Sequence, residues 1–333
     1  MSAPVDLHRV ATDLVSGERG ILAADESIAT MSSRLEAEGI EPSVSNRRDY
    51  RELLLTAPDL AGTVSGIILC DETFRQELSD GTAFPAAARR LGVLPGIKVD
   101  TGVEPFPGAT RATVTRGLDG LPARLSEYAD LGAAFAKWRA VIDVADPDEG
   151  ALEANAAALA DYAFACQQHA IVPIVEPEVL CSGTHDLGAC ADVTTAALMT
   201  VFDHLEDRGV DLAGIVLKPN MVTPGLAHSE PSSALVVAEA TLAVLRATVP
   251  SNVPGIAFLS GGHSNADACA FLTAINRLAG DSPWQLTYSF GRALVSDALH
   301  AWGGDTSRVG AAQAVLLENC ARASRASYPA VAA

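Results

Sequence analysis

Lysine is almost absent from this sequence of 333 residues. The 23 basic residues comprise 20 arginines and only three lysines, Lys98, Lys137 and Lys218. Lysine is ordinarily a solvated surface residue, yet each of these three follows an apolar, strand-like run. A single lysine so placed could belong to a structural ion-pair network. Because none is left for the surface, we interpret all three as candidates for chemistry.

Positive charge is also scarce overall, since the net charge at pH 7 is -18. Nucleic acid and anionic membranes are repelled by such a chain, so we expect neither as a partner. A small anionic substrate would therefore need a local pocket of basic residues.

Paired-cysteine motifs and nucleotide fingerprints are missing as well. The six cysteines show no C-x-x-C spacing, which favours free thiols in a reducing cytosol and predicts a cytoplasmic protein. Cys181, His185, Asp186 and Cys190 share one predicted loop, but their spacing is not that of a standard zinc site. No glycine-rich nucleotide motif follows the first apolar run. We therefore expect no metal and no cofactor.

Long hydrophobic runs are lacking. Residues 1–20 contain no apolar signal core. The most apolar stretch, Ala234–Val249, contains Glu239 and Arg246, which fits an amphipathic helix and not a membrane span. Aromatic residues make up only 5% of the chain, against 49% hydrophobic residues in all. We expect a core of Ala, Val, Leu and Ile, which suits a sheet covered by helices.

Eight short apolar runs are present instead. Most begin with glycine and end with polar residues, which predicts buried strands. They are Gly20–Asp25, Gly66–Asp71, Gly96–Asp100, Ala134–Ile142, Ile171–Glu178, Gly214–Met221, Gly255–Gly262 and Trp284–Gly291.

Helical patterns lie between these runs. They cover Met31–Glu38, Arg47–Thr56, Gly81–Leu91, Ser126–Ala133, Ala151–His169, Thr194–Arg208, Pro231–Val249, Asn265–Ala279, Arg292–Trp302 and Arg308–Arg325. Strands that alternate with helices require right-handed crossovers and a parallel sheet. Eight units predict an α/β fold, a single-domain (β/α)8 TIM barrel over residues 1–333. Residues 1–19 would form an N-terminal helix region, and 303–333 a C-terminal helix and short tail. An open doubly wound sheet is the alternative.

The stretch Gly214–Met221 contains the most informative lysine. Pro219 cannot donate to a strand ladder, so the buried strand should end at Lys218. A buried ammonium is costly unless it is paired or loses its charge. Burial can lower the pKa of a lysine, and a neutral amine attacks carbonyls. Lys218 is thus a candidate nucleophile.

Charged residues recur at the predicted strand ends, where barrel enzymes place their chemistry. Residues two apart on a strand share a side, so Lys137 and Arg139 face one way, as do Glu176 and Glu178. If both pairs point inward, cations and carboxylates meet beside Lys218, a setting in which pKa values separate. A charged rim that pairs with arginines is the alternative for the two glutamates. The remaining strand ends contribute Asp25, Asp71, Lys98, Asp100, Ser260 and Arg292.

The last two runs end in Leu-Ser-Gly-Gly (Leu259–Gly262) and Ser-Phe-Gly-Arg (Ser289–Arg292). Phosphate sites of such barrels often use the loops after strands seven and eight. Glycines let backbone N–H groups approach phosphate oxygens, and arginine adds a bidentate cation. A simple turn would explain one such loop, but two adjacent loops favour a phosphate site.

At these residues the sequence closely resembles the class I, Schiff-base-forming fructose-bisphosphate aldolases. The matching motifs occur in the family's order over most of the chain. They are Gly20–Ser27, Asn46–Thr56, Gly96–Asp100, Phe135–Arg139, Ile171–Glu178, Leu217–Met221, Phe258–Gly262 and Ser289–Leu294.

The resemblance implies a role for each matching position. Lys218 would form the Schiff base, and Glu176 would be its general acid and base, with Glu178 beside it. Lys137 would balance charge, and Asp25 would accept the C4-hydroxyl proton. One phosphate would be held by Ser260, Gly261, Gly262, Ser289 and Arg292. The other end of the substrate would be held by Ser27, Arg34 and Lys98, with Arg139 near it.

The resemblance also implies an activity and its limits. It implies reversible, metal-independent cleavage of fructose 1,6-bisphosphate in glycolysis or gluconeogenesis, by a homo-oligomer that is often a tetramer. The family's Thr-Gly-Ser is Ile28-Ala29-Thr30 here, and a family lysine is Thr101. The family's tyrosine-ended tail has no counterpart after Tyr328, so C3 proton transfer should be slower or use another group. The alternatives are a transaldolase-like Schiff-base enzyme and a non-catalytic sugar-phosphate-binding protein.

Overall fold

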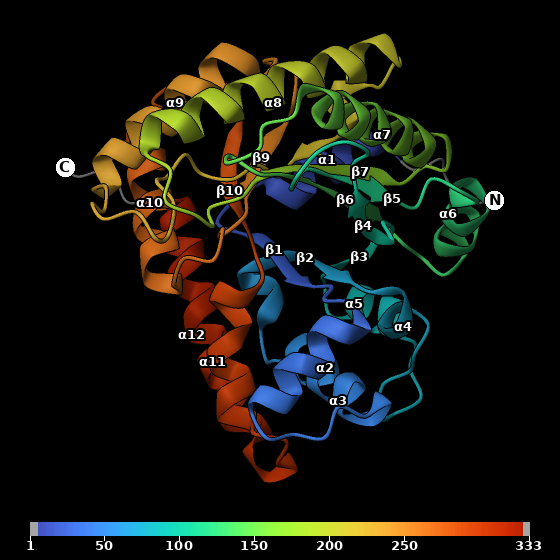
Figure 1. Ribbon diagram of the computed structural model, residues 1–333. Coiled ribbons are helices and arrows are strands. Elements are labelled where there is room, and N and C mark those ends of the chain that lie inside the picture. The colour runs from blue at the N-terminus through green and yellow to red at the C-terminus, as the bar shows by residue number, and fades with distance from the viewer. Residues whose placement is uncertain (1–5, 329–333) are drawn as a thin grey trace.

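The computed structural model describes residues 6–328, in which eight parallel strands close into a barrel surrounded by helices (Figure 1). The order around the barrel is β1-β10-β9-β8-β7-β6-β3-β2. The strands are β1 (Gly20–Ala24), β2 (Val64–Leu69), β3 (Leu94–Lys98), β6 (Phe135–Ile142), β7 (Val172–Val179), β8 (Val216–Leu217), β9 (Gly255–Phe258) and β10 (Gln285–Phe290). Ile21 pairs with Ser289 where β1 meets β10. The TIM barrel is thereby confirmed, and the open doubly wound sheet is wrong.

The helices are α1 (Leu7–Val15), α2 (Ile28–Ala37), α3 (Val44–Leu55), α4 (Asp71–Phe74), α5 (Phe84–Arg90), α6 (Leu121–Asp130), α7 (Glu149–Gln168), α8 (Leu187–Asp207), α9 (Ala234–Thr248), α10 (Asn265–Ala279), α11 (Arg292–Trp302) and α12 (Val309–Ser327). Several begin at a side chain that accepts a hydrogen bond from the first turn, as Ser27 does for α2 and Ser264 for α10. No helix within residues 6–328 is long and apolar enough to cross a bilayer.

Each of the eight predicted runs overlaps one barrel strand, but the strand before Lys218 is shorter than predicted. Only Val216 and Leu217 are strand residues there. Lys218 still donates its backbone N–H to the carbonyl of Val175 at 2.8 Å. Pro219 has no N–H to continue the ladder. The lysine is therefore fixed by one last bond, where the strand ends.

A short antiparallel hairpin lies between β3 and β6 along the chain, and the sequence did not predict it. It consists of β4 (Gly102–Pro105) and β5 (Thr113–Arg116). The Thr115 hydroxyl donates to the carbonyl of Arg139 at 2.8 Å, which ties the hairpin to β6. Its first residues, Gly102 and Val103, border the cavity described below.

The lower half of the barrel interior is apolar and is closed by α1. Val10, Leu14 and Val15 of α1 pack against inward side chains of the strands, among them Phe135. Space for the Phe135 ring depends on glycine, because a Cβ atom on Gly96 would lie 2.2 Å from that ring. This packing leaves only the opposite, C-terminal end of the barrel open for polar chemistry.

Successive side chains of β6 point alternately outward, under the helices, and inward, to the cavity. Trp138 points outward, where its ring lies 5.5 Å from that of Tyr162 on α7. Lys137 and Arg139 point inward to the cavity. Since successive strand residues face opposite sides of the sheet, burial of Trp138 under α7 fixes the direction of both cations.

Candidate active site

A cavity of about 510 Å³ opens at the C-terminal end of the barrel. All three lysines of the chain line it. Most other residues that the sequence nominated line it as well, namely Asp25, Ser27, Arg34, Arg139, Glu176, Glu178, Ser260, Gly261, Ser289 and Arg292. Cationic side chains thus gather in one pocket of an otherwise acidic protein.

Lys218 and Glu176 form a buried pair at the base of this cavity. Each residue is only 3% exposed, and Lys218 Nζ lies 3.0 Å from Glu176 Oε1. They extend from neighbouring strands, because β8 pairs with β7. The pair places a proton acceptor directly beside the amine.

Lys137 links this pair to Asp25. Its Nζ atom lies 2.7 Å from Asp25 Oδ2 and 3.1 Å from Glu176 Oε2. Burial by itself would lower the pKa of Lys137, but the carboxylates of Asp25 and Glu176 raise it above its ordinary value. Lys137 is therefore a fixed positive charge between two carboxylates.

The pKa values of the two carboxylates shift in the opposite direction, below their ordinary values. Burial would raise the pKa of Asp25, but Lys137 and Lys218 lower it to about 2. Burial would also raise the pKa of Glu176, and the same two ammonium groups hold it below its ordinary value. Glu176 Oε2 accepts no hydrogen bond from the part of the chain that the structure describes, although Lys137 is close. Both groups are ionised in the free protein, and each oxygen of Glu176 faces one ammonium group.

A second layer of charge surrounds this centre. Arg139 donates from Nε to Glu178, so these two neutralise each other. Lys98 Nζ donates to Asp100 Oδ1 at 2.5 Å and to its backbone carbonyl at 2.9 Å. Lys98 remains partly exposed to the cavity, with 20% of its side chain accessible, and can contact a ligand.

The side of the cavity next to β8 is suited to an anion. Ser260 follows β9, and Ser289 and Arg292 come from the end of β10 and the start of α11. The buried Ser289 hydroxyl has no hydrogen-bond partner among residues 6–328. Gly261 needs its positive φ of +59°, and a Cβ atom there would lie 2.5 Å from Cys181 Sγ. The loop can therefore present its backbone only with glycine at this position.

Gly262, which the resemblance assigned to the phosphate, does not line the cavity. It is one residue further along the loop and also has a positive φ, of +92°. An ideal Cβ atom on it would lie 3.5 Å from the Arg292 guanidinium. This is an ordinary contact distance, so Gly262 is required for its backbone conformation, and it contributes no surface of the cavity.

The start of α2 forms the opposite side. Ser27 caps α2 by accepting from the N–H of Thr30 at 3.2 Å. Arg34, one helical turn after Thr30, is paired with Glu26. Glu26 also approaches Arg51 at 3.5 Å and is thereby anchored to α3. This arrangement aims the Arg34 guanidinium at the cavity.

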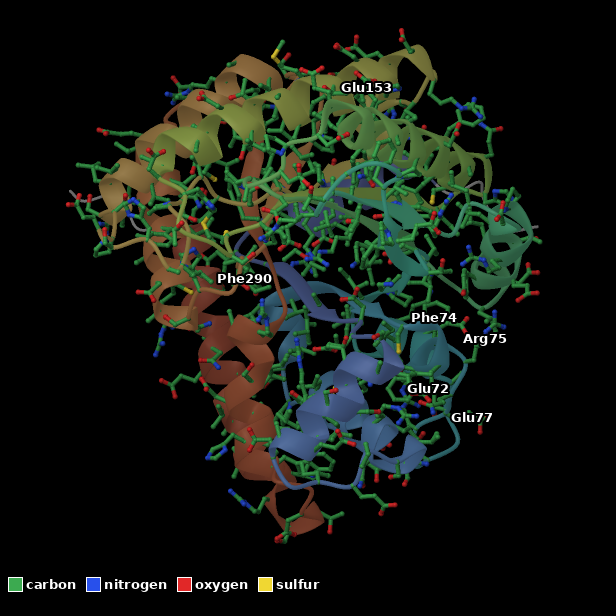
Figure 2. All side chains as sticks on the ribbon, viewed as in Figure 1. Glu72, Phe74, Arg75, Glu77, Glu153 and Phe290 are labelled. Carbon is green, nitrogen blue, oxygen red and sulfur yellow. The ribbon has the colours of Figure 1, made fainter. Side chains whose placement is uncertain are left out.

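Sequence reasoning misplaced one residue and missed others. Asp71 begins α4 and pairs with Arg75 at 2.7 Å, and Figure 2 shows Arg75 at the outer edge of the molecule. The Asp71 side chain is 55% exposed and is not part of the site. The missed lining residues include Glu26, Thr30 and Val103, whereas Asp100, named among the strand ends, does line the cavity. Of these, Glu26 lies inside a quoted motif, so its position was available as a signal.

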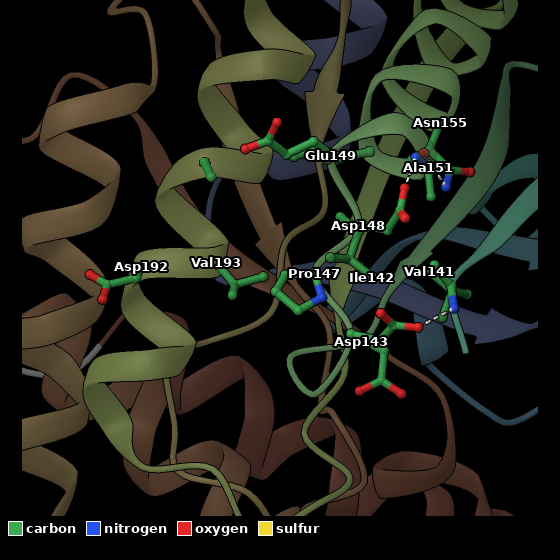
Figure 3. Close-up of a pocket in the computed structure, with 14 residues that line it drawn as sticks. Val141, Ile142, Asp143, Pro147, Asp148, Glu149, Ala151, Asn155, Asp192 and Val193 are labelled. Carbon is green, nitrogen blue, oxygen red and sulfur yellow. Dashed lines mark hydrogen bonds between the residues drawn. The ribbon is translucent and has the colours of Figure 1, made fainter. Parts of the chain in front are cut away.

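A second cavity, of about 240 Å³, lies outside the barrel between the end of β6 and helices α7 and α8 (Figure 3). Its polar groups serve the fold. Asp148 caps α7 by accepting from Ala151 at 2.8 Å, and Asp143 pairs with Arg111 at 2.7 Å. Within residues 6–328, no group of three or more His, Cys, Asp or Glu side chains is arranged to hold a metal.

The main cavity can perform one type of chemistry especially well. A buried amine lies beside a carboxylate that can accept and return a proton. Anion-binding groups lie on either side of this pair. Such a site can capture the carbonyl of a phosphorylated compound covalently, because an imine forms from an amine with the loss of water.

Comparison with known proteins agrees with this geometry. The family model for class-I fructose-bisphosphate aldolase matches residues 6–332. Fructose-bisphosphate aldolase 5, cytosolic, of Arabidopsis thaliana is 47% identical over 317 residues, which are 95% of this chain and 88% of the relative. A probable class 1 fructose-bisphosphate aldolase of Xanthomonas campestris is 46% identical over 94% of each chain.

A solved structure is similar over nearly the same length. It is the fructose-bisphosphate aldolase of Plasmodium falciparum in complex with TRAP and a small-molecule inhibitor. The TM-score is 0.94 at 41% identity, and the match covers 97% of this chain and 94% of the other.

Proposed function

The chain belongs to the class I fructose-bisphosphate aldolase family, and from this premise we propose how its own residues perform the reaction. The protein is a lyase that reversibly cleaves fructose 1,6-bisphosphate to dihydroxyacetone phosphate and glyceraldehyde 3-phosphate. The observation that carries the assignment of roles is the contact of Lys218 with Glu176 at the base of the cavity.

Substrate binding uses the two anion-binding sides. β8, which ends at Lys218, pairs with β9, so the loop of Ser260 and Gly261 lies on the side of Lys218. We assign the C1 phosphate to Ser260, Gly261, Ser289 and Arg292, because C1 adjoins the C2 carbonyl that Lys218 attacks. Arg34, Ser27 and Lys98 then receive the C6 phosphate. Two phosphates held this way place C2 against Nζ.

Imine formation uses Glu176 twice. Its carboxylate takes a proton from the Lys218 ammonium, and the neutral amine then adds to the C2 carbonyl. The resulting carbinolamine hydroxyl leaves as water when Glu176 returns that proton. The product is a protonated imine and an ionised Glu176.

Carbon–carbon cleavage uses Asp25. Its carboxylate accepts the proton of the C4 hydroxyl while the C3–C4 bond breaks. The electron pair of that bond forms the C2–C3 double bond of an enamine, and the imine nitrogen loses its positive charge. Lys137 holds Asp25 in place. Glyceraldehyde 3-phosphate leaves first, and protonation and hydrolysis of the enamine then release dihydroxyacetone phosphate.

The experiment that tests this function is a substrate panel in the presence of a chelator. We expect cleavage of fructose 1,6-bisphosphate at an undiminished rate in EDTA, because the electron sink is the imine. Turnover of a sugar monophosphate without turnover of the bisphosphate would indicate a transaldolase-like enzyme. Loss of all activity in EDTA would indicate a metal-dependent lyase. Ligand binding without any turnover would indicate a non-catalytic protein.

Three broader properties are further proposals. Residues 1–333 form one domain, which is supported by the packing of α12 against β10 through Ser327 and Thr287, 3.2 Å apart. The protein is a homo-oligomer, as the family resemblance implies. It acts in the cytoplasm, which is supported by the name of the Arabidopsis relative, since that name calls the enzyme cytosolic. Light scattering after size exclusion measures the oligomer. The expected short tail includes residues 329–333, which lie outside the described residues.

A further inference from the structure

A second group of arginines lies apart from the active site, on the outer face of α10 and α12. The two helices pack side by side (Figure 1). A groove of about 410 Å³ between them is lined by Arg277, Arg322 and Arg325. Its floor is formed by Cys269 and Ala326, which are both buried. Three guanidinium groups on one groove are unexpected in a chain of net charge -18.

Two of these cations have no counter-charge. Arg277 and Arg325 are exposed, and neither makes an ion pair or a side-chain hydrogen bond with any residue from 6 to 328. Arg322 is held weakly, by Asn265 Oδ1 at 3.2 Å and Glu318 Oε1 at 3.4 Å. Arg292 in the active site is also without a partner among these residues, and there the expected anion is a substrate phosphate.

The positive field reaches the floor of the groove. Burial raises the pKa of the Cys269 thiol to about 11, but Arg322 and Arg325 oppose this rise. Both guanidinium groups are therefore near enough to stabilise a negative charge at the floor. A guanidinium fork pairs with phosphate oxygens through two parallel hydrogen bonds. The groove is thus suited to adjacent phosphoryl groups.

An apolar groove of about 520 Å³ adjoins the first one, between α9 and α10. Leu235 and Leu278 line it and are 53% and 39% exposed. Ala270, Thr273 and Arg277 line both grooves. Because the ridge between the grooves carries small side chains at positions 270 and 273, a flat ligand can lie across α10.

We propose that this double groove binds a nucleoside di- or triphosphate. The phosphates lie between Arg277, Arg322 and Arg325, and the base covers the apolar surface of Leu235 and Leu278. The two halves match the two parts of such a molecule, one strongly anionic and one flat and largely apolar. The site is outside the barrel cavity and is independent of the Schiff-base chemistry.

The test is calorimetric titration of ATP into the whole protein. Saturating hexitol 1,6-bisphosphate, which has no carbonyl, keeps ATP out of the active site. We expect one ATP per chain, with binding weakened about tenfold or more in the Arg277→Gln/Arg325→Gln double variant. The matched control is Arg9→Gln/Arg308→Gln, which removes the same charge from other exposed positions. The control should bind ATP within about twofold of wild type.

The outcomes distinguish binding at this site from general attraction of ATP to positive charge. Equal weakening in both double variants means general Coulombic attraction and overturns the site, as does a wild type that binds no ATP. Pyrophosphate should bind more weakly than ATP, and Leu235→Ser should remove that difference. Pyrophosphate as tight as ATP overturns the assignment of the base. A Glu-rich peptide that binds the groove where ATP does not also overturns it. Both double variants should cleave the bisphosphate normally, which shows that they fold.

Discussion

Lys218 Nζ lies 3.0 Å from Glu176 Oε1, while Lys137 Nζ lies 3.1 Å from the other oxygen of the same carboxylate. One buried carboxylate therefore faces two buried ammonium groups. A carboxylate in this position can take a proton from one amine without losing its second positive neighbour. This relationship supports the role proposed for Glu176 in both steps of imine formation.

The two glutamates of β7 should differ strongly in their effect on catalysis. Glu176→Gln removes the group that moves the proton, so we expect kcat to fall by about 10²- to 10⁴-fold. Glu178 pairs with Arg139, so Glu178→Gln should cost much less. Steady-state kinetics of both variants makes the comparison at equal change of charge. Equal losses would mean that Glu176 acts only through the electrostatic field of the site.

Asp25 should contribute stability that depends on pH. Its pKa is lowered from 3.8 to about 2 in the folded protein, so the unfolded chain binds the proton more readily. The contribution, about 2 kcal/mol, is therefore present above pH 4 and is lost as the pH falls toward 2. Urea unfolding of wild type and Asp25→Asn should show a difference that shrinks from pH 5 to pH 3. A difference that stays constant over this range contradicts the low pKa.

The two anion-binding sides should respond to different parts of the substrate. Arg34→Ala removes a contact assigned to the C6 phosphate, so kcat/KM for fructose 1,6-bisphosphate should fall by about 10- to 100-fold. The same variant should cleave fructose 1-phosphate as the wild type does. Arg292→Ala should impair both substrates, because both carry the C1 phosphate. A loss for fructose 1-phosphate in Arg34→Ala would show that the two ends are assigned in the wrong order.

Packing inside the barrel depends on the absence of a side chain at Gly96. A Cβ atom there would lie 2.2 Å from the Phe135 ring, so Gly96→Ala should destabilise the fold by about 1–3 kcal/mol. Gly310→Ala is the control, because nothing lies within 4 Å of its added Cβ, and it should cost nothing. In the Phe135→Leu background the loss should shrink. An undiminished loss there would place the strain in the backbone and not in the ring.

Much of the barrel could be predicted from the sequence, because buried parallel strands form short apolar runs separated by helical patterns. The same logic located the charged centre, since the ends of parallel strands meet at one face. Lys137 and Glu176 could thus be brought together without coordinates. Arg34 could not, because it lies on a helix and only the resemblance to the family singled it out.

Other features could not be predicted from the sequence, and each has a physical reason. Asp71 also follows an apolar run, but it begins α4 and points to the surface, because a polar residue after a strand can equally start a helix. The β4–β5 hairpin has short strands whose residues are largely accessible, so no hydrophobic run marks it. Glu26 supports Arg34 and Arg51 through contacts between distant segments, which no local pattern encodes.

The most direct test is reduction with borohydride in the presence of dihydroxyacetone phosphate, followed by peptide mapping of the trapped adduct. We expect one adduct per chain, on Lys218, and none in the Lys218→Arg variant, which keeps the positive charge. An adduct on Lys98 or Lys137 of the wild-type protein, or full turnover without any adduct, would contradict this expectation.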